Sequence, residues 1–231
     1  MSSTGTNKFE KRLSRLRLYT FGAIAAVALV AIGLSGLGSP AANAAEDAAE
    51  PVALLPAPAF ELTDTMGQTH KLADYLADGQ TVVLEWFNPG CPYVKKYHDG
   101  ENANPSMREA YAFAKQHGVV WLAVNSGAPG MQGHGLEHNR EMRAEYGIDY
   151  PVLLDESGTV GRAYGATSTP HLFIINPAGE IVYHGGVDDT VTKNDQPSGN
   201  YVIAALTQLM AGEAVHPAET AHPGCSVKYA K

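Results

Sequence analysis

The chain has 231 residues, enough for one domain or two small ones, and its hydrophobic fraction of 45% is sufficient for a buried core. Its formal net charge is −8, but the first 44 residues hold five basic residues and one acid, so the remainder carries −12. A body this acidic repels phosphate backbones, which argues against a nucleic-acid partner. The composition also excludes a disordered polyelectrolyte, because only 17% of the residues are charged.

The first 44 residues have the layout of a secretory signal peptide. Basic residues between positions 8 and 17 precede an uncharged apolar run, Phe21 to Leu37, and small residues at 42–44 form a cleavage-site pattern. An uncleaved membrane anchor is the alternative, because the run of 17 residues lies at the lower end of the length of a spanning helix. Both interpretations predict a periplasmic or secreted body, which contacts a membrane only if the segment stays uncleaved. Residues 45–57 are rich in Ala, Glu and Pro and are predicted to be a flexible leader.

The body alternates short apolar runs with helical patterns. Strands are predicted at residues 60–62, 70–72, 81–87, 119–124, 152–154, 171–175 and 180–184. Helices are predicted from Pro92 to about 116 with an interruption at 100–105 and a restart at Ser106 as N-cap, and at 136–146, 157–164 and 201–210. The run 81–87 is apolar on both faces, which is typical of a covered central strand. This order predicts an α/β domain over residues 58–212 with a mixed sheet flanked by helices, followed by an irregular tail at 213–231.

Cys91 and Cys225 are the two cysteines of the chain. Cys91 lies between Gly90 and Pro92, where the buried strand gives way to a helix, and proline is well tolerated in a first helical turn. The free N–H groups and the positive end of the dipole at a helix N-terminus stabilise a thiolate, which is the reactive form of cysteine. Cys91 is therefore predicted to be an accessible nucleophile, and a buried structural cysteine is the alternative interpretation.

The segment around Cys91 resembles the active site of the thioredoxin-like superfamily, most closely its redoxin branch of alkyl hydroperoxide reductase and thiol-specific antioxidant proteins. The residues that carry the resemblance are 86–94 (WFNPGCPYV), 58–62 (PAFEL), 150–155 (YPVLLD) and 169–175 (TPHLFII). The resemblance implies a thioredoxin-like fold with an N-terminal β-hairpin, and a thiol oxidoreductase or antioxidant enzyme. It also implies that Pro170 is cis and lies against the Cys91 thiol. Substrate contacts would then come from Pro92, Tyr93, Thr169 and Pro170.

Three positions depart from the parent families. A dithiol thioredoxin has its second cysteine where this chain has Val94, and a peroxiredoxin has Thr or Ser at Asn88 and an arginine near Pro170. The chain is similar instead to a peroxiredoxin-like subgroup with a Cys-Pro-(aromatic)-Val-Lys site. Residues 224–228 also resemble the C-terminal end of that subgroup. The expected partners are a protein disulfide or thiol, or a hydroperoxide, together with an external thiol reductant. A thiol peroxidase and a non-catalytic binding module such as a copper chaperone are the alternatives.

Cys225 is the candidate resolving cysteine for Cys91. From Gly212, an extended tail at about 3.3 Å per residue reaches roughly 40 Å, which is ample to return to the site. A static disulfide and a free or intermolecular thiol are the other interpretations, since exported proteins usually oxidise paired cysteines.

The remaining polar groups are ambiguous. His98 lies two helical turns from Cys91, roughly 10 Å along the axis, which is too far to share a metal ion. His171 or His184 could bind copper, but the two close cysteines of copper-delivery proteins are missing, so neither a metal nor another cofactor is expected. His222 is predicted to be a solvated loop residue. Glu85 either shuttles protons near the thiol or forms a salt bridge at the sheet face.

Overall fold

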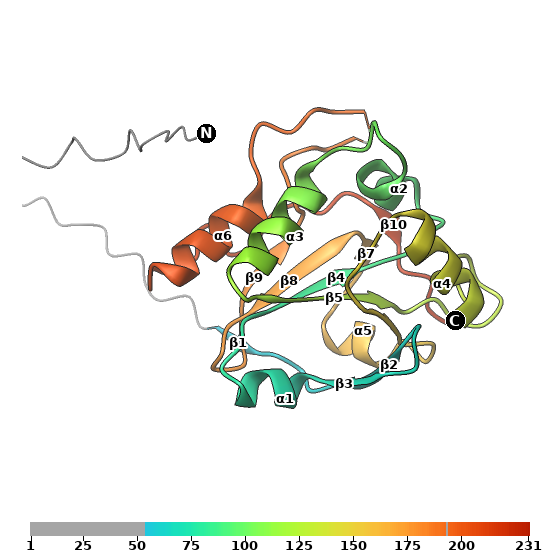
Figure 1. Cartoon of the computed structure of the whole chain (residues 1–231), viewed down its shortest axis with the longest axis horizontal. Coiled ribbons are helices and arrows are strands. Elements are labelled where there is room, and N and C mark those ends of the chain that lie inside the picture. The colour runs from blue at the N-terminus through green and yellow to red at the C-terminus, as the bar shows by residue number, and fades with distance from the viewer. Residues whose placement is uncertain (1–53, 193) are drawn as a thin grey trace, which may run out of the picture. The chain divides into compact units, whose positions relative to one another are not determined.

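The fold is built on an eight-stranded mixed sheet (Figure 1). The computed structural model describes residues 54–192 and 194–231, so the predicted signal segment and most of the predicted leader lie outside the described residues. The strands are β1 (Leu55–Pro56), β2 (Glu61–Asp64), β3 (Thr69–Lys71), β4 (Val82–Trp86), β5 (Val120–Asn125), β6 (Val152–Leu154), β7 (Ser168–Thr169), β8 (His171–Ile175), β9 (Glu180–Gly185) and β10 (Cys225–Ser226). The helices are α1 (Leu72–Ala77), α2 (Pro92–His98), α3 (Ser106–Gln116), α4 (Leu136–Glu145), α5 (Thr159–Ala163) and α6 (Tyr201–Met210).

Strand β4 lies in the middle of the sheet, as its apolar sequence predicts. The strand order is β1-β9-β8-β4-β5-β6-β2-β3, and β4 runs parallel to β5 and antiparallel to β8. All five residues of β4 are buried, because both of its faces are covered. The mixed sheet flanked by helices confirms the α/β, thioredoxin-like fold, with the β2–β3 hairpin at one edge.

Alternation along β4 divides the core into two layers. Val83 and Phe87 face a cluster that includes side chains of α2, α3 and α6, and Cys91 belongs to this cluster. Val82, Leu84 and Trp86 face the opposite cluster, which is covered by α1 and by residues at and after α5. Trp86 therefore lies on the other face of the sheet from Cys91 and has a packing role.

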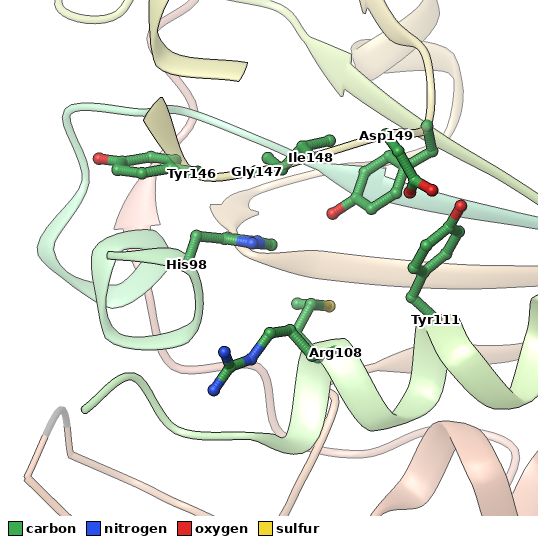
Figure 2. A pocket seen from close by; sticks show the side chains of 9 residues that line it. His98, Arg108, Tyr111, Tyr146, Gly147, Ile148 and Asp149 are labelled. Atoms are coloured by element: carbon green, nitrogen blue, oxygen red, sulfur yellow. The ribbon is translucent and has the colours of Figure 1, made fainter. Parts of the chain in front are cut away.

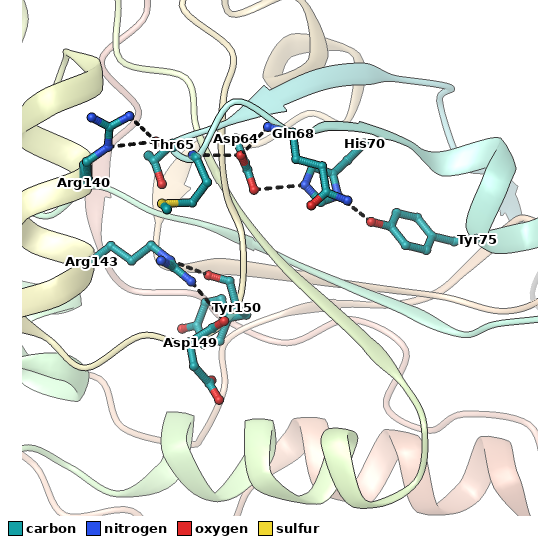
Figure 3. A network of polar contacts seen from close by, with 10 residues as sticks. Asp64, Thr65, Gln68, His70, Tyr75, Arg140, Arg143, Asp149 and Tyr150 are labelled. Atoms are coloured by element: carbon teal, nitrogen blue, oxygen red, sulfur yellow. Dashed lines mark hydrogen bonds and ion pairs between the residues drawn. The ribbon is translucent and has the colours of Figure 1, made fainter.

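The N-terminal hairpin is fixed by a polar network around Asp64 (Figure 3). The Asp64 carboxylate accepts hydrogen bonds from the N–H groups of Met66 at 2.8 Å and Gln68 at 2.9 Å, and it lies 3.1 Å from His70 Nε2. His70 Nδ1 in turn meets the Tyr75 hydroxyl at 2.5 Å. Burial opposes ionisation of Asp64, but these N–H groups and the His70 ring outweigh it and lower the pKa of the carboxyl. The turn of the predicted hairpin is thus capped by its own side chain.

Three elements differ from the prediction: the first strand, a helix after β3 and the start of α3. Leu55 and Pro56 pair antiparallel with β9, so the sheet begins inside the segment that the sequence assigned to a flexible leader. Helix α1 follows β3 directly and was not predicted. Ser106 is the first residue of α3 rather than its N-cap, and its N–H is bound by the Asn104 side chain at 2.9 Å.

The C-terminal segment is irregular, as predicted, apart from one short strand. Strand β10 pairs antiparallel with β7 in a second, two-stranded sheet, with Cys225 opposite Thr169 and Ser226 opposite Ser168. A two-residue strand has no periodicity from which the sequence could predict it, and its partner β7 is equally short. The consequence is that the end of the chain lies across the segment that precedes Pro170.

Candidate active site

Cys91 lies at the junction of β4 and α2, where the sequence predicts it. The Asn88 side chain accepts a hydrogen bond from the Gly90 N–H at 2.9 Å and so closes the turn after the strand. Cys91 is the N-cap of α2, and its carbonyl accepts the N–H groups of Val94 at 3.0 Å and Lys95 at 2.9 Å. Pro92 begins the helix, where its missing N–H leaves no bond unmade.

The thiol of Cys91 is buried, which contradicts the prediction of an accessible sulfur. Its residue is 0% exposed, and its Sγ–H donates to the carbonyl oxygen of Thr169 at 3.1 Å. The peptide bond between Thr169 and Pro170 is cis, as the family resemblance implies. The thiol therefore lies against the cis-proline segment, but it is covered in this conformation.

Cys225 is part of that cover. It lies opposite Thr169 in the β7–β10 ladder and packs against the apolar cluster that contains Cys91. Both cysteines are free thiols. Burial, followed by the neighbouring Cys91 side chain, raises the pKa of Cys225 to about 11, although Lys228 and the Tyr93 N–H oppose the shift. The fold thus brings together two cysteines that are far apart in the sequence. The sequence alone did not determine whether they meet.

The four predicted substrate contacts divide into two pairs. Pro92 is exposed and Tyr93 is half-buried, with its ring against the core and its N–H toward the Cys225 thiol. Thr169 and Pro170 are buried, and the backbone of Thr169 is taken up by β10. Only the α2 side of the site is open to a partner in this conformation.

Beneath α2, Glu85 is held by a polar network inside the core. Its Oε1 lies 2.9 Å from His98 Nε2, and its Oε2 accepts the Tyr150 hydroxyl at 2.9 Å and the Trp121 indole N–H at 3.2 Å. Burial and then the Glu85 charge raise the pKa of Tyr150 well above its usual value. Of the two interpretations of Glu85, the geometry favours the salt bridge, with the buried His98 ring as the partner. The pairing with His98 was missed because it joins a strand to a helix 13 residues later.

The His98 ring also lines a cavity of about 270 Å³ on the outer side of this network (Figure 2). Arg108, Tyr111 and Tyr146 are among the other residues around it. The Tyr146 ring stacks on His98 with ring centroids 6.1 Å apart, and its hydroxyl donates to the Pro89 carbonyl at 3.0 Å. Tyr146 therefore ties α4 to the turn that carries Cys91.

Three histidines lie beside β7, and the environment of one of them differs from the prediction. His222 is half-buried rather than solvated, and its ring stacks on His171 with centroids 3.7 Å apart. The His184 ring lies 5.9 Å from that of His171. Within residues 54–192 and 194–231, no group of three His, Cys, Asp or Glu side chains is arranged to hold a metal ion. Both ring nitrogens of His171 are buried without a hydrogen-bond partner.

Comparison with known proteins shows the family to which this chain belongs and several similar proteins. The Redoxin family profile matches residues 55–203. The thiol-disulfide oxidoreductase ResA of Geobacillus kaustophilus is 33% identical over 139 residues, which cover 60% of this chain and 71% of that protein. The ResA protein of Bacillus subtilis is 33% identical over 126 residues, covering 54% and 63%.

Two solved structures of proteins without a stated activity are similar over most of their length. The hypothetical protein SMc02350 of Sinorhizobium meliloti superposes with a TM-score of 0.66 at 26% identity, covering 77% of this chain and 94% of that one. An uncharacterized conserved protein of Geobacillus kaustophilus gives 0.64 at 28% identity, covering 77% and 92%.

A thioredoxin-like fold with a cysteine at the N-terminus of the helix after the central strand, facing a cis-proline, defines the class of thiol oxidoreductase enzymes. The chain belongs to the Redoxin family.

Proposed function

We propose that this protein is an exported thiol–disulfide oxidoreductase in which Cys91 is the nucleophile and Cys225 is the resolving cysteine. The observation that carries the proposal is that both cysteines lie at Thr169 and that their side chains are neighbours. The Cys91 thiol donates to the Thr169 carbonyl at 3.1 Å, and Cys225 is the residue opposite Thr169 in the ladder. The kinship with ResA proteins, whose name states thiol–disulfide chemistry, supports the same reaction.

The reaction proceeds by two exchanges. The Cys91 thiolate attacks one sulfur of a substrate disulfide, a bond from Cys91 to that sulfur forms, and the substrate's second sulfur leaves as a thiolate and takes up a proton. The Cys225 thiolate then attacks Cys91 Sγ, which forms a 91–225 disulfide and releases the first substrate sulfur. The substrate gains two electrons and the enzyme loses two, and an external thiol reductant restores the dithiol.

The raised pKa of Cys225 suits the second role. A thiol with a pKa of about 11 remains protonated near neutral pH, so Cys225 is a poor first nucleophile. The shift comes from burial and from the unreacted Cys91 thiol beside it. Once Cys91 is in a mixed disulfide, the second cause is gone and burial alone raises the pKa of Cys225, while Lys228 and the Tyr93 N–H favour the thiolate.

A peroxidase of peroxiredoxin type is less well supported. Such an enzyme needs free donors to polarise the O–O bond of the peroxide. At Asn88, the side-chain oxygen already accepts the Gly90 N–H at 2.9 Å, and its amide donates to the Gln132 carbonyl at 3.3 Å. Thiol–disulfide exchange needs no such donor.

The proposal of export depends on the N-terminal segment. A basic start, an apolar run and small residues precede the domain in the sequence. Within the part of the chain that the structure describes, no helix is long and apolar enough to cross a membrane. Fractionation of cells that express the full chain tests the proposal, which requires the protein in the periplasm, in the medium or on the outer side of the membrane.

The test of the chemistry is reduction of insulin disulfides with glutathione as the external thiol, using wild type, Cys91→Ser, Cys225→Ser and, as a control beside the second cysteine, Ser226→Ala. Cys91→Ser should abolish turnover, and Cys225→Ser should accumulate a mixed disulfide at Cys91 that mass spectrometry detects. Wild type should form a 91–225 disulfide after one turnover without glutathione. Turnover by Cys91→Ser at the wild-type rate would refute the proposal.

A further inference from the structure

The C-terminal strap, residues 218–230, is seated on the domain at three places. At its start, the His184 N–H donates to the Ala218 carbonyl at 2.9 Å, and the Thr220 N–H donates to the His184 carbonyl at 3.2 Å. In its middle, β10 pairs with β7. At its end, the Tyr229 hydroxyl donates to the Ala166 carbonyl at 2.8 Å, with the Arg162 guanidinium 4.5 Å from the Tyr229 ring centroid.

A clasp of three side chains sets the position of the middle part. Ser168 Oγ donates to the His222 carbonyl at 2.9 Å and lies 2.7 Å from His222 Nδ1. The His222 ring also stacks on His171. His222 is therefore held by Ser168 of β7 and by His171 of β8. The clasp lies three residues before Cys225 and therefore fixes which strap residue comes to lie opposite Thr169.

The strap carries no buried residue, whereas the groups beneath it are buried. All residues from 218 to 230 are exposed or half-exposed, but Ser168, Thr169 and Pro170 are covered. The strap is held by surface hydrogen bonds and by partial packing of Cys225 and Val227 against the two core clusters. An element with no buried residue of its own opens at a lower free energy than the core does. The strap can therefore leave the site while the central sheet stays folded.

We propose that the C-terminal strap is a displaceable cover of the active site: it leaves β7 to admit an extended polypeptide to Cys91, and the His222 clasp guides it back to deliver Cys225. This inference rests on the proposed function of Cys91 and Cys225. An extended substrate and the strap compete for the same backbone groups of Thr169, because one strand edge pairs with one partner. Return of the strap thus resolves the mixed disulfide and displaces the substrate in the same movement.

A glycine in the strap allows the cover to be loosened without touching either cysteine. A Cβ added to Gly224 would collide with the Thr169 carbonyl oxygen and would lie 2.8 Å from its carbonyl carbon, both backbone atoms that cannot give way. Gly224→Ala should therefore lift the strap from β7. Gly199→Ala is the matched control, because a Cβ at Gly199 meets nothing within 4 Å. His222→Ala removes the clasp independently, and the exposed His138 provides its control as His138→Ala.

The experiment measures the rate at which iodoacetamide alkylates Cys91, read by mass spectrometry, in a Cys225→Ser background so that one thiol reacts. Gly224→Ala and His222→Ala should each raise the rate by about tenfold, which corresponds to the loss of one or two hydrogen bonds. The two controls should leave it unchanged. Equal rates in all five proteins, or a parent Cys91 that reacts as fast as in urea, would overturn the strap as a cover.

Two further measurements distinguish the possible outcomes. Thermal unfolding of each variant identifies a general loss of structure, and His222→Ala decides the result if Gly224→Ala does not fold. Insulin reduction by the proteins that retain Cys225 tests the proposed function separately. Normal dependence of turnover on Cys91 together with unchanged alkylation rates would reject the cover and leave the redox function standing.

Discussion

The two sides of the thiol pair are built in different ways. On the Cys91 side, every residue of β4 is buried, and Glu85 beneath α2 is 0% exposed with three side-chain partners. On the Cys225 side, the strap keeps all of its residues at least partly exposed and is held by a two-residue ladder, by further surface hydrogen bonds and by partial packing of Cys225 and Val227. One cysteine therefore belongs to the core, while the other belongs to a part of the chain that can move without it.

This difference suits the two thiols to different steps of the reaction. Cys91 is fixed by the strand–helix junction, so its geometry toward Pro170 is the same in every state in which the sheet is folded. Cys225 reaches Cys91 only while β10 lies on β7. A resolving cysteine on a docking segment has a high effective concentration when docked and a low one when the strap is away, which separates substrate attack from resolution in time.

The largest expected effect comes from breaking the core side. Glu85→Ala should lower the free energy of unfolding by about 3–5 kcal/mol, because the buried donors of Trp121 and Tyr150 and the His98 ring lose their partner. Urea unfolding at pH 7 measures the loss. Glu137→Ala is the control, since Glu137 forms an exposed ion pair with Arg140 at 2.9 Å that contributes about 1 kcal/mol or less. Equal midpoints for the two variants would contradict the core assignment of Glu85.

The core side is also the part that the sequence could predict. The apolar run of β4, the break at Pro89-Gly90 and the proline after Cys91 are local signals, and each forms the element that its pattern indicates. The hairpin of β2 and β3 and helix α6 follow in the same way. The cis bond before Pro170 came from the family resemblance and not from the residue pattern, because the sequence around a proline does not determine its isomer.

The strap side could not be predicted because its contacts are non-local. The Cys91 thiol meets a carbonyl 78 residues away, and Ser168 meets His222 across 54 residues. The segment Cys225-Ser226 becomes a strand only because Thr169 lies beside it, so its own sequence favours nothing. The burial of Cys91 and the stacking of His222 both depend on that docking, which is why both expectations failed.

A weaker test of the strap side uses pH. Burial, then the neighbouring His222 and His184, lower the pKa of His171 from 6.5 to about 3, and burial lowers that of His222 as well. The unfolded chain binds these protons more readily, so the stabilisation is complete above about pH 6.5 and is lost as the pH falls toward 3. The loss attributable to His171 should reach a few kcal/mol. Urea unfolding at pH 7, 5 and 4 should be less pH-dependent in His171→Phe than in wild type, and parallel curves would reject the assignment.

The Tyr229→Phe variant tests whether the strap opens separately from the core, and it should change stability least. Tyr229→Phe removes only the hydroxyl that donates to the Ala166 carbonyl at 2.8 Å, a bond that contributes about 1 kcal/mol. Because the strap opens separately from the core, this loss should act on the strap alone. Amide exchange at Val227, whose N–H donates to the Thr167 carbonyl at 3.1 Å, should accelerate by about fivefold. Exchange at Leu84 in β4 should stay at the wild-type rate in the same sample. If both amides accelerate together, the strap and the core unfold as one unit, and the two cysteines do not belong to separately opening elements.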